Sequence, residues 1–260
     1  MAKFQEVGTV VSQNSLCDGI YDLVIRAQKI ASEAKAGQFV SVYCKDASHL
    51  LPRPISLCDI DKNSGTVRLV YRVVGYGTDE FSRLASGDSI RLVGPLGNGY
   101  SLKNKRAFVI GGGIGIPPML QTAKELLAGG MAKDDIQIVL GYRDYCFLKE
   151  EFERYGVVTV ATEDGSAGTK GNVIDAIRAC NLKADILYAC GPTPMLRALK
   201  AYASDNDIEA YLSLEERMAC GIGACLGCVC KSKDVDDHSH VNNKRVCADG
   251  PVFNAQDIEL

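Results

Sequence analysis

The pattern of apolar residues changes near residue 104, and this change limits the possible folds more than any other feature of the chain. Before it, short segments rich in Val, Ile and Tyr alternate with turn residues such as Asn14-Ser15 and Asn63-Ser64-Gly65. Strands at this spacing predict a small antiparallel barrel or a sandwich. The six predicted strands span residues 4–12, 21–27, 38–44, 55–60, 66–74 and 89–93.

After residue 104, short apolar strands alternate with segments of helical period. The first strand, Ala107–Ile110, leads through a run of glycines into a predicted helix at Pro117–Leu127. Alternating strands and helices predict a parallel sheet with helices on both faces. The further predicted strands span residues 136–140, 157–161 and 186–190, and the further predicted helices span 147–155, 173–180 and 194–203.

The last segment, from about Ser213, is rich in glycine and cysteine and has little periodicity. It is too short to build its own hydrophobic core, so we expect it to fold around a metal centre. The expected domains are therefore a β domain at 1–102, an α/β domain at 103–212 and a cysteine-rich segment at 213–260.

Charge and hydropathy argue against nucleic acid and membrane as partners. The chain carries 29 Lys and Arg against 32 Asp and Glu, a net charge of −3, whereas both partners select a concentrated basic face. The longest apolar stretch, 107–120, contains four glycines and two prolines and does not predict a membrane span. The first residues show no secretory signal, which predicts a cytoplasmic protein. Eleven cysteines in that compartment favour metal binding or redox chemistry over disulfides.

Four cysteines near the end of the chain have the spacing of iron–sulfur ligands. Cys220-x4-Cys225-x2-Cys228, followed by Cys247, matches the plant-type pattern for a [2Fe–2S] cluster. Three glycines lie between Cys220 and Cys228. They let the backbone wrap tightly around a cluster and point its N–H groups at the sulfurs. Cys230 lies close by and is interpreted as a bystander thiol.

A structural zinc site is the alternative for the same segment. Cys225, Cys228 and Cys247 together with His238 or His240 would supply four zinc ligands. The four-residue gap and the glycines favour iron–sulfur over zinc, and the two histidines lie in an acidic polar stretch typical of a solvated loop.

Two glycine turns in the α/β region are candidate nucleotide sites. The first follows a strand and opens a helix, where backbone N–H groups can receive a pyrophosphate. The second follows a later strand and could hold Cys190 against a nicotinamide or simply cap a helix. No acidic residue ends the second strand, so the choice between NAD and NADP stays open. The residues of the two turns are Gly111, Gly112, Gly113 and Gly115, and Cys190, Gly191 and Pro192.

In the β region, Arg53-Pro54-Ile55-Ser56 places a guanidinium and a hydroxyl at the start of a strand. Both groups are good donors to a diphosphate, although an Arg-Pro at this place also occurs as an ordinary sheet edge. The later glycine loops at 75–78 and 94–99 are either ligand loops or plain turns.

In this order the motifs resemble the ferredoxin–NADP reductase superfamily with a cluster-binding extension. The likeness covers essentially the whole chain and narrows to the electron-transfer subunits of class 1B dihydroorotate dehydrogenase. Its most specific part is the run from Glu216 to Cys228. The other motifs are Arg53-Pro-Ile-Ser, Gly77-Thr78, Gly94-Pro-Leu-Gly-Asn-Gly, Gly111-Gly-Gly-Ile-Gly and Cys190-Gly-Pro.

The resemblance implies FAD on a six-stranded antiparallel β-barrel, NAD(H) on a Rossmann-like parallel α/β domain and a [2Fe–2S] cluster on the C-terminal segment. Ile55 departs from the aromatic residue usual at its place, and the loop before Cys247 is longer than is usual. The implied FAD residues are Arg53, Pro54, Ile55 and Ser56 along the cofactor, Val70, Tyr71 and Arg72 beside it, and Gly77 and Thr78 at its phosphates. The implied nucleotide residues are those of the two glycine turns, and the implied cluster ligands are Cys220, Cys225, Cys228 and Cys247.

The resemblance also implies a function. NADH delivers two electrons at once and the cluster accepts one, so the flavin is the gate between them. The implied partner is an FMN-containing catalytic subunit, in a heterotetramer of two plus two, that interconverts dihydroorotate and orotate in pyrimidine (UMP) biosynthesis. This chain is not expected to perform that chemistry alone. The alternatives are a subunit of an NADH-dependent ferredoxin:NADP oxidoreductase or of a sulfide dehydrogenase, a stand-alone flavin reductase, and a zinc-stabilised binding module without redox activity.

Overall fold

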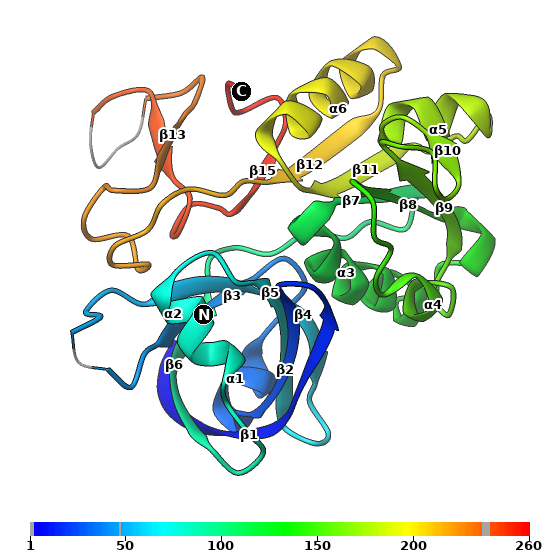
Figure 1. Cartoon of the computed structure of the whole chain (residues 1–260). Helices are drawn as coiled ribbons and strands as arrows, with labels where there is room; N and C mark the ends of the chain where they lie inside the picture. The colour runs from blue at the N-terminus through cyan, green and yellow to red at the C-terminus, as the bar shows by residue number, and fades with distance from the viewer. Residues whose placement is uncertain (1–2, 47, 236–239) are drawn as a thin grey trace.

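The computed structural model describes residues 3–46, 48–235 and 240–260. Its first six strands close into an antiparallel barrel in the order β1-β2-β5-β4-β3-β6, at the bottom of Figure 1. Alternate residues of these strands, such as Leu23, Val40 and Leu57, fill the barrel interior. The barrel elements are β1 (Phe4–Cys17), β2 (Ile20–Arg26), α1 (Gln28–Glu33), β3 (Phe39–Tyr43), β4 (Arg53–Asp61), β5 (Thr66–Arg72), α2 (Tyr76–Ser82) and β6 (Ser89–Leu96).

The first hairpin differs from the prediction. We expected a turn at Asn14-Ser15, but β1 continues through both residues to Cys17, and the chain reverses at Asp18-Gly19. Gly19 has a φ of 70°, a left-handed conformation that glycine adopts without steric cost. The register shifts between Ser15 and Cys17 absorb the extra length of the strand.

The second lobe is an α/β sheet in the order β10-β9-β8-β7-β11-β12-β15. Helices α3 and α4 cover the face toward the barrel, while α5 and α6 cover the other face (Figure 1). The central strand β7 is buried on both sides, with Val109 in one core and Phe108 in the other. The elements are β7 (Ala107–Gly112), η1 (Gly113–Gly115), α3 (Ile116–Ala128), η2 (Lys133–Asp135), β8 (Ile136–Tyr142), α4 (Lys149–Phe152), β9 (Val157–Thr162), β10 (Thr169–Lys170), α5 (Val173–Ala179), β11 (Ile186–Cys190), α6 (Thr193–Asp205) and β12 (Glu209–Ser213).

The cysteine-rich segment is not a separate unit. It forms a small hairpin of β13 (Val229–Lys231) and β14 (Asn243–Arg245), and then returns as β15 (Val252–Asn254), which pairs antiparallel with β12. The N–H of Leu214 donates to the carbonyl of Pro251 at 2.9 Å, so the excursion starts and ends at the same sheet edge. Because the segment lacks its own core, Val246 and Phe253 are buried in the core of the α/β lobe.

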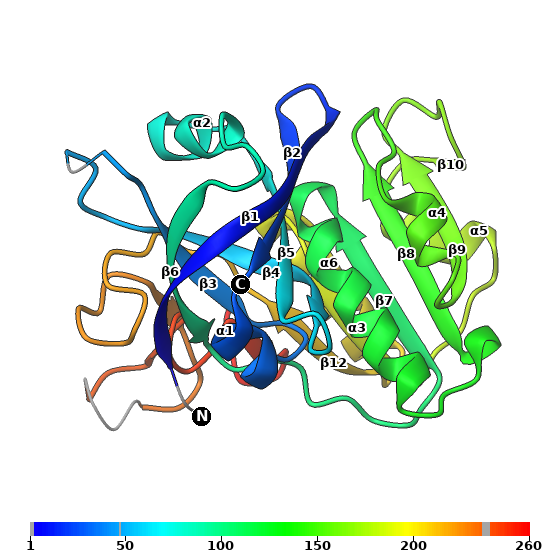
Figure 2. The same cartoon turned by 90° about the horizontal axis from the view of Figure 1, so that it is seen from below.

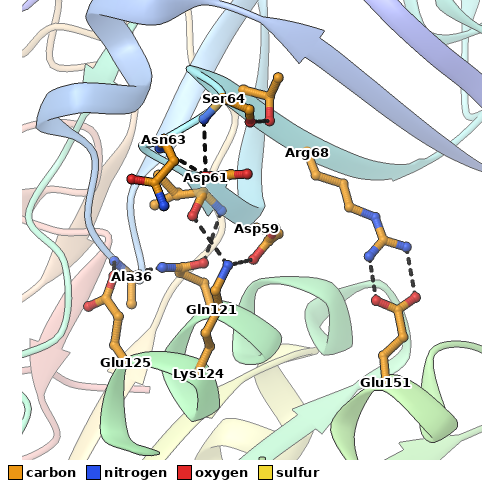
Figure 3. A network of polar contacts seen from close by, with 12 residues as sticks. Ala36, Asp59, Asp61, Asn63, Ser64, Arg68, Gln121, Lys124, Glu125 and Glu151 are labelled. Carbon is orange, nitrogen blue, oxygen red and sulfur yellow. Dashed lines mark hydrogen bonds and ion pairs between the residues drawn. The ribbon is translucent and has the colours of Figure 1, made fainter. Parts of the chain in front are cut away.

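Helix α3 joins the two lobes through polar contacts with β4 (Figure 3). Gln121 accepts the backbone N–H of Ile60 at 2.9 Å, and the Lys124 ammonium lies 2.7 Å from Asp59. The Glu125 carboxylate accepts a hydrogen bond from the side-chain amide of Gln121. It also accepts the backbone N–H of Ala36, which lies in the loop before β3. These bonds attach the second half of the helix to the outside of the barrel, and Figure 2 shows α3 lying beside the barrel strands.

A second connection between the lobes runs through Arg68. Its guanidinium forms two bonds of 2.8 Å to Asp22 within the barrel and two of 2.5 and 2.9 Å to Glu151 of α4. The side chains of Arg68 and Asp22 are only 16% and 12% exposed, so solvent screens this network little. Among the described residues, no helix has the length and hydropathy needed to span a bilayer.

Arg68→Met should lower the free energy of unfolding by about 2–3 kcal/mol, because Asp22 would stay largely buried without its cation. Urea unfolding of the cofactor-loaded chain, followed by far-UV circular dichroism, measures this. The matched control is Glu153→Gln, which breaks the exposed Lys149–Glu153 pair and should change stability by less than about 0.5 kcal/mol. Equal effects of the two variants would contradict a special role for Arg68.

Candidate functional site

The four cysteines of the C-terminal segment converge as two pairs. The Cys225 thiol lies close enough to Cys220 to help lower the pKa of Cys220, and the Cys228 thiol lies close enough to Cys247 to help raise the pKa of Cys247. The backbone N–H of Cys247 also donates to Cys228 Sγ at 3.4 Å. Cys228 and Cys247 are buried, whereas Cys225 is exposed.

This pairing fits a two-iron centre. Each iron of a [2Fe–2S] cluster takes two thiolates, while a single zinc needs all its ligands around one point. These four cysteines all lie in the described part of the chain, and no three of their sulfurs lie within 4.8 Å of one another. Of the histidines in the zinc alternative, His240 is exposed and His238 lies outside the described residues.

Backbone N–H groups are aimed at the sulfurs, as an anionic cluster requires. Gly223 donates to Cys247 Sγ at 3.1 Å and Ala224 donates to Cys220 Sγ at 3.3 Å. Burial alone would raise the pKa of the Cys220 thiol, but the N–H groups around it outweigh burial and lower that pKa. Cys230 lies in β13 opposite Lys244 of β14, and burial raises the pKa of its thiol to about 11, which fits a bystander.

The cluster loop rests directly on the barrel. A side chain at Gly221 would come within 2.8 Å of Ser41 Oγ on β3, so only glycine allows this approach. Ser41 is 2% exposed, and its hydroxyl has no hydrogen-bond partner among the described residues. A buried hydroxyl without a partner is typical of a place where a bound group supplies the bond.

The two glycine turns of the α/β lobe are in backbone contact. Gly111 at the end of β7 pairs with Cys190 at the end of β11. A Cβ at Gly115 would lie 2.5 Å from the Cys190 carbonyl, and one at Gly112 would lie 2.4 Å from Met195 Sδ. The sequence left open whether these turns only cap helices, and the structure brings both to one place.

That place is where the strand order reverses. From β7 the chain proceeds outward through β8 and β9, and it then returns to β11 on the other side of β7. Ligands of open parallel sheets bind outside the carboxyl ends of the strands at such a switch point. Pro117 and Pro118 occupy the first turn of α3, where their missing N–H groups cost little.

Cys190 is a neutral thiol in this structure. Burial raises its pKa to about 12, against a smaller opposite effect of the Ser213 hydroxyl. A thiolate nucleophile is therefore not available at neutral pH, and the side chain offers a small uncharged surface instead. Tyr100, which no motif in the sequence marks, lies beside this turn, and its hydroxyl donates to the carbonyl of Ala189 at 2.9 Å.

The predicted flavin residues divide between the two faces of the barrel wall. Ile55 and Tyr71 point into the barrel core, so their side chains do not face a ligand outside it. Val70 and Arg72 point outward, and Val70 packs in the core shared with Met119 of α3. In the same stretch as Ile55, Pro54 is exposed and Ser56 half-buried.

Arg53 and Gly77 lie against each other. A Cβ at Gly77 would overlap the Arg53 side chain, 2.0 Å from its Nε, whereas one at Gly75 would meet nothing within 4 Å. The hydroxyl of Thr78 accepts the N–H groups of Val74 and Gly75 and so closes the turn before α2. The same hydroxyl donates to the Gly75 carbonyl at 3.0 Å, and a contact of Gly77 and Thr78 with the phosphates of FAD stays a prediction.

A further group of potential ligands lies at the barrel end. Cys44, His49 and Glu80 have donor atoms within 4.8 Å of one another. The Glu80 carboxylate accepts the N–H of Lys45 at 2.6 Å, and His49 Nδ1 faces Asp46 at 3.4 Å. Cys44, His49 and Glu80 therefore lie close together because these contacts close the loop that precedes Arg53.

Comparison with known proteins agrees with this geometry. Residues 215–259 match the iron-sulfur cluster binding domain of dihydroorotate dehydrogenase B, and residues 109–201 match the oxidoreductase NAD-binding domain. The chain is 43% identical over 263 residues to the dihydroorotate dehydrogenase B (NAD(+)) electron transfer subunit of Geobacillus sp. (strain WCH70), covering 98% of this chain and 99% of that one. The same subunit of Listeria monocytogenes serotype 4a (strain HCC23) is 42% identical, covering 96% and 97%.

The chain belongs to the dihydroorotate dehydrogenase B electron transfer subunits. Among solved structures, an NADH-dependent reduced ferredoxin-NADP oxidoreductase superimposes with a TM-score of 0.86 at 30% identity, covering 98% of this chain and 90% of that chain. A flavohemoglobin from Malassezia yamatoensis with bound FAD and heme shares the fold, with a TM-score of 0.66 at 19% identity over 80% of this chain and 58% of that chain. Membership of this family confirms the iron–sulfur interpretation of the cysteine spacing over zinc.

Gly115→Ala should slow flavin reduction by NADH about 100-fold, because the new methyl group separates the two turns and displaces the nucleotide. Stopped-flow spectroscopy at 450 nm measures the rate, and reduction by dithionite should stay unchanged. Gly129→Ala, at the other end of α3 and 3.2 Å from the nearest carbonyl, is the control and should behave as the wild type. An unchanged NADH rate in Gly115→Ala would argue against a nucleotide at these turns.

Proposed function

We propose that this chain carries electrons between NAD(H) and the FMN-containing catalytic subunit of a dihydroorotate dehydrogenase, through FAD and a [2Fe–2S] cluster. The observation that carries the proposal is the paired cysteine quartet in a chain that is 43% identical, over its full length, to subunits of this name. We further propose a cytoplasmic complex of two copies of each subunit that serves pyrimidine biosynthesis.

The chain's own residues have separate tasks in this proposal. The glycine turns at Gly111–Gly115 and Cys190–Pro192 receive the pyrophosphate and nicotinamide of NAD(H), because close backbone approach leaves room and free N–H groups there. Arg53 and Ser56 donate to FAD, while Arg72, exposed at the end of β5, lies beside it and the buried Val70 supports that wall from the core. FAD, when bound, supplies the conversion between hydride transfer and single-electron transfer.

The barrel is the middle of the electron path. On one side, α3 follows the nucleotide turn and shares a hydrophobic core with Val70. On the other side, Gly221 of the cluster loop contacts Ser41. Two exposed apolar residues, Ile222 and Leu226, lie within three positions of the exposed Cys225 in the chain, which supports a partner that docks at the cluster and excludes water there.

Gly77→Ala should weaken FAD binding about tenfold, because the methyl group displaces the Arg53 guanidinium and removes a charge-assisted contact of about 1.4 kcal/mol. Flavin fluorescence during dialysis against FAD-free buffer measures the affinity. Gly75→Ala is the matched control, since a Cβ there meets nothing within 4 Å and its φ of 179° suits any residue. If both variants retain FAD equally, Arg53 is not a cofactor residue.

Coupling to the partner tests the proposed function itself. The wild-type chain mixed with the FMN subunit should reduce orotate with NADH. Cys247→Ser should still reduce FAD with NADH but should transfer no electrons to the partner above background. Cys230→Ser, beside the quartet but outside it, should behave as the wild type. A wild-type chain with full cofactors and no orotate reduction would overturn the proposal.

The alternative with structural support is the flavin subunit of an NADH-dependent ferredoxin-NADP oxidoreductase. It is favoured by the TM-score of 0.86 to that enzyme, although the identity of 30% is lower than the 43% to the dihydroorotate dehydrogenase relatives. A chain that couples to the ferredoxin-NADP partner, and not to the FMN subunit, would establish this alternative.

A further inference from the structure

Arg245 links the two halves of the cluster site. Its guanidinium holds Asp249 with two bonds of 2.9 Å, from Nε and Nη2 to the two carboxylate oxygens. Its remaining nitrogen, Nη1, donates to the carbonyl of Gly223 at 3.2 Å. Gly223 lies between Cys220 and Cys225, so Arg245 connects the first cysteine loop to the turn that carries Cys247.

The backbone of Arg245 shapes that turn as well. Its carbonyl accepts the N–H groups of Ala248 at 3.1 Å and Asp249 at 2.8 Å, while its own N–H donates to the Asp249 carboxylate at 2.7 Å. Cys247 therefore lies in a turn that is closed both by the backbone and by a two-point ion pair. The Arg245 and Asp249 side chains are 20% and 25% exposed, which strengthens the pair relative to one at the surface.

Gly223 is held from both sides. Its carbonyl accepts the bond from Arg245, and its N–H donates to Cys247 Sγ at 3.1 Å. With a φ of +91° and an ideal Cβ position 2.7 Å from Ala248, Gly223 has a conformation that other residues rarely adopt. One hydrogen bond joins Arg245 to Gly223 and another joins Gly223 to Cys247, while the backbone joins Arg245 to Cys247. These links form a closed ring that includes one cluster ligand.

We propose that Arg245 is a positioning residue that raises the reduction potential of the cluster. It holds Gly223 so that the Gly223 N–H points at the Cys247 sulfur. A hydrogen bond to a ligand sulfur stabilises the more negative, reduced cluster and so makes reduction easier. The inference rests on the proposed function only in taking the cysteine quartet as the cluster site, and it does not depend on the identity of the partner.

The test is the midpoint potential of the cluster, followed by electron paramagnetic resonance during potentiometry of the cofactor-loaded chain without partner. Arg245→Met should shift the midpoint to more negative potentials. Arg245→Lys should shift it in the same direction, because a lysine keeps the charge but lacks the fork that holds Asp249 and Gly223 together. Lys231→Met removes an exposed charge from β13 of the same segment and should leave the midpoint unchanged.

Asp249→Asn separates positioning from simple charge. If Arg245 and Asp249 acted only as charges, removal of the Asp249 carboxylate would shift the midpoint to more positive potentials. If they position Gly223, the weakened fork should shift the midpoint to more negative potentials and change the g-values. A positive shift in Asp249→Asn, or a wild-type midpoint in Arg245→Lys, would overturn the proposal.

The iron content of each variant is measured, to show that the cluster is still bound. Should Arg245→Met bind less than two irons per chain, Arg245→Lys and Asp249→Asn carry the test instead. Flavin reduction by NADH should be normal in every variant, since hydride transfer to the flavin precedes and does not use the cluster. A failed orotate assay would leave these potentials interpretable, so the two hypotheses can fail separately.

Discussion

The docking of α3 on the barrel is the constraint from which the arrangement of the other sites follows. The helix begins at the glycine turn, places Met119 in the hydrophobic core that also contains Val70 of the barrel, and bonds to β4 through Gln121 and Lys124 in its second half. A helix of 13 residues is a rigid rod of about 20 Å. The nucleotide turn therefore has a set distance and orientation relative to the barrel wall, and Arg68 adds a second connection through Glu151. Two points of attachment resist the rotation that one would allow.

The cluster segment has no hydrophobic core of its own and is held in place by the two lobes and by polar contacts. Residues 214–251 contain no Phe, Tyr or Trp, and a segment this short cannot bury enough surface to fold alone. The structure places Val246 and Cys247 in the core of the α/β lobe and rests Gly221 on the barrel. The remaining order comes from polar contacts between the cysteine loops, among which the bonds of Arg245 are prominent. A cofactor that binds both pairs of thiols would add to a framework that the chain already provides.

Local patterns predicted what depends on local physics. The six barrel strands and the alternating strands and helices followed from periodicity, and the cluster followed from the spacing of four cysteines. The turn at Asp18-Gly19 was missed because polar residues at Asn14-Ser15 gave a similar signal earlier in the chain. Contacts such as Arg68–Glu151 and Arg245–Gly223 join residues 83 and 22 positions apart and have no local signature. The assignment of individual residues to FAD and NAD(H) remains a prediction, because it depends on the bound molecules.

The return of β15 to the edge of the sheet makes the cluster segment exchangeable in principle. Its two ends, Leu214 and Pro251, are joined by a backbone hydrogen bond of 2.9 Å between neighbouring strands. The entropy of closing a loop grows only with the logarithm of its length, so inserts of quite different size would cost the host sheet nearly the same. A nucleotide-binding oxidoreductase built in this way can acquire or replace a one-electron carrier at one edge of its sheet, as long as the new segment refills the core positions of Val246 and Cys247. For engineering, the junction at this pair of residues is the natural place to graft another redox module onto the fold.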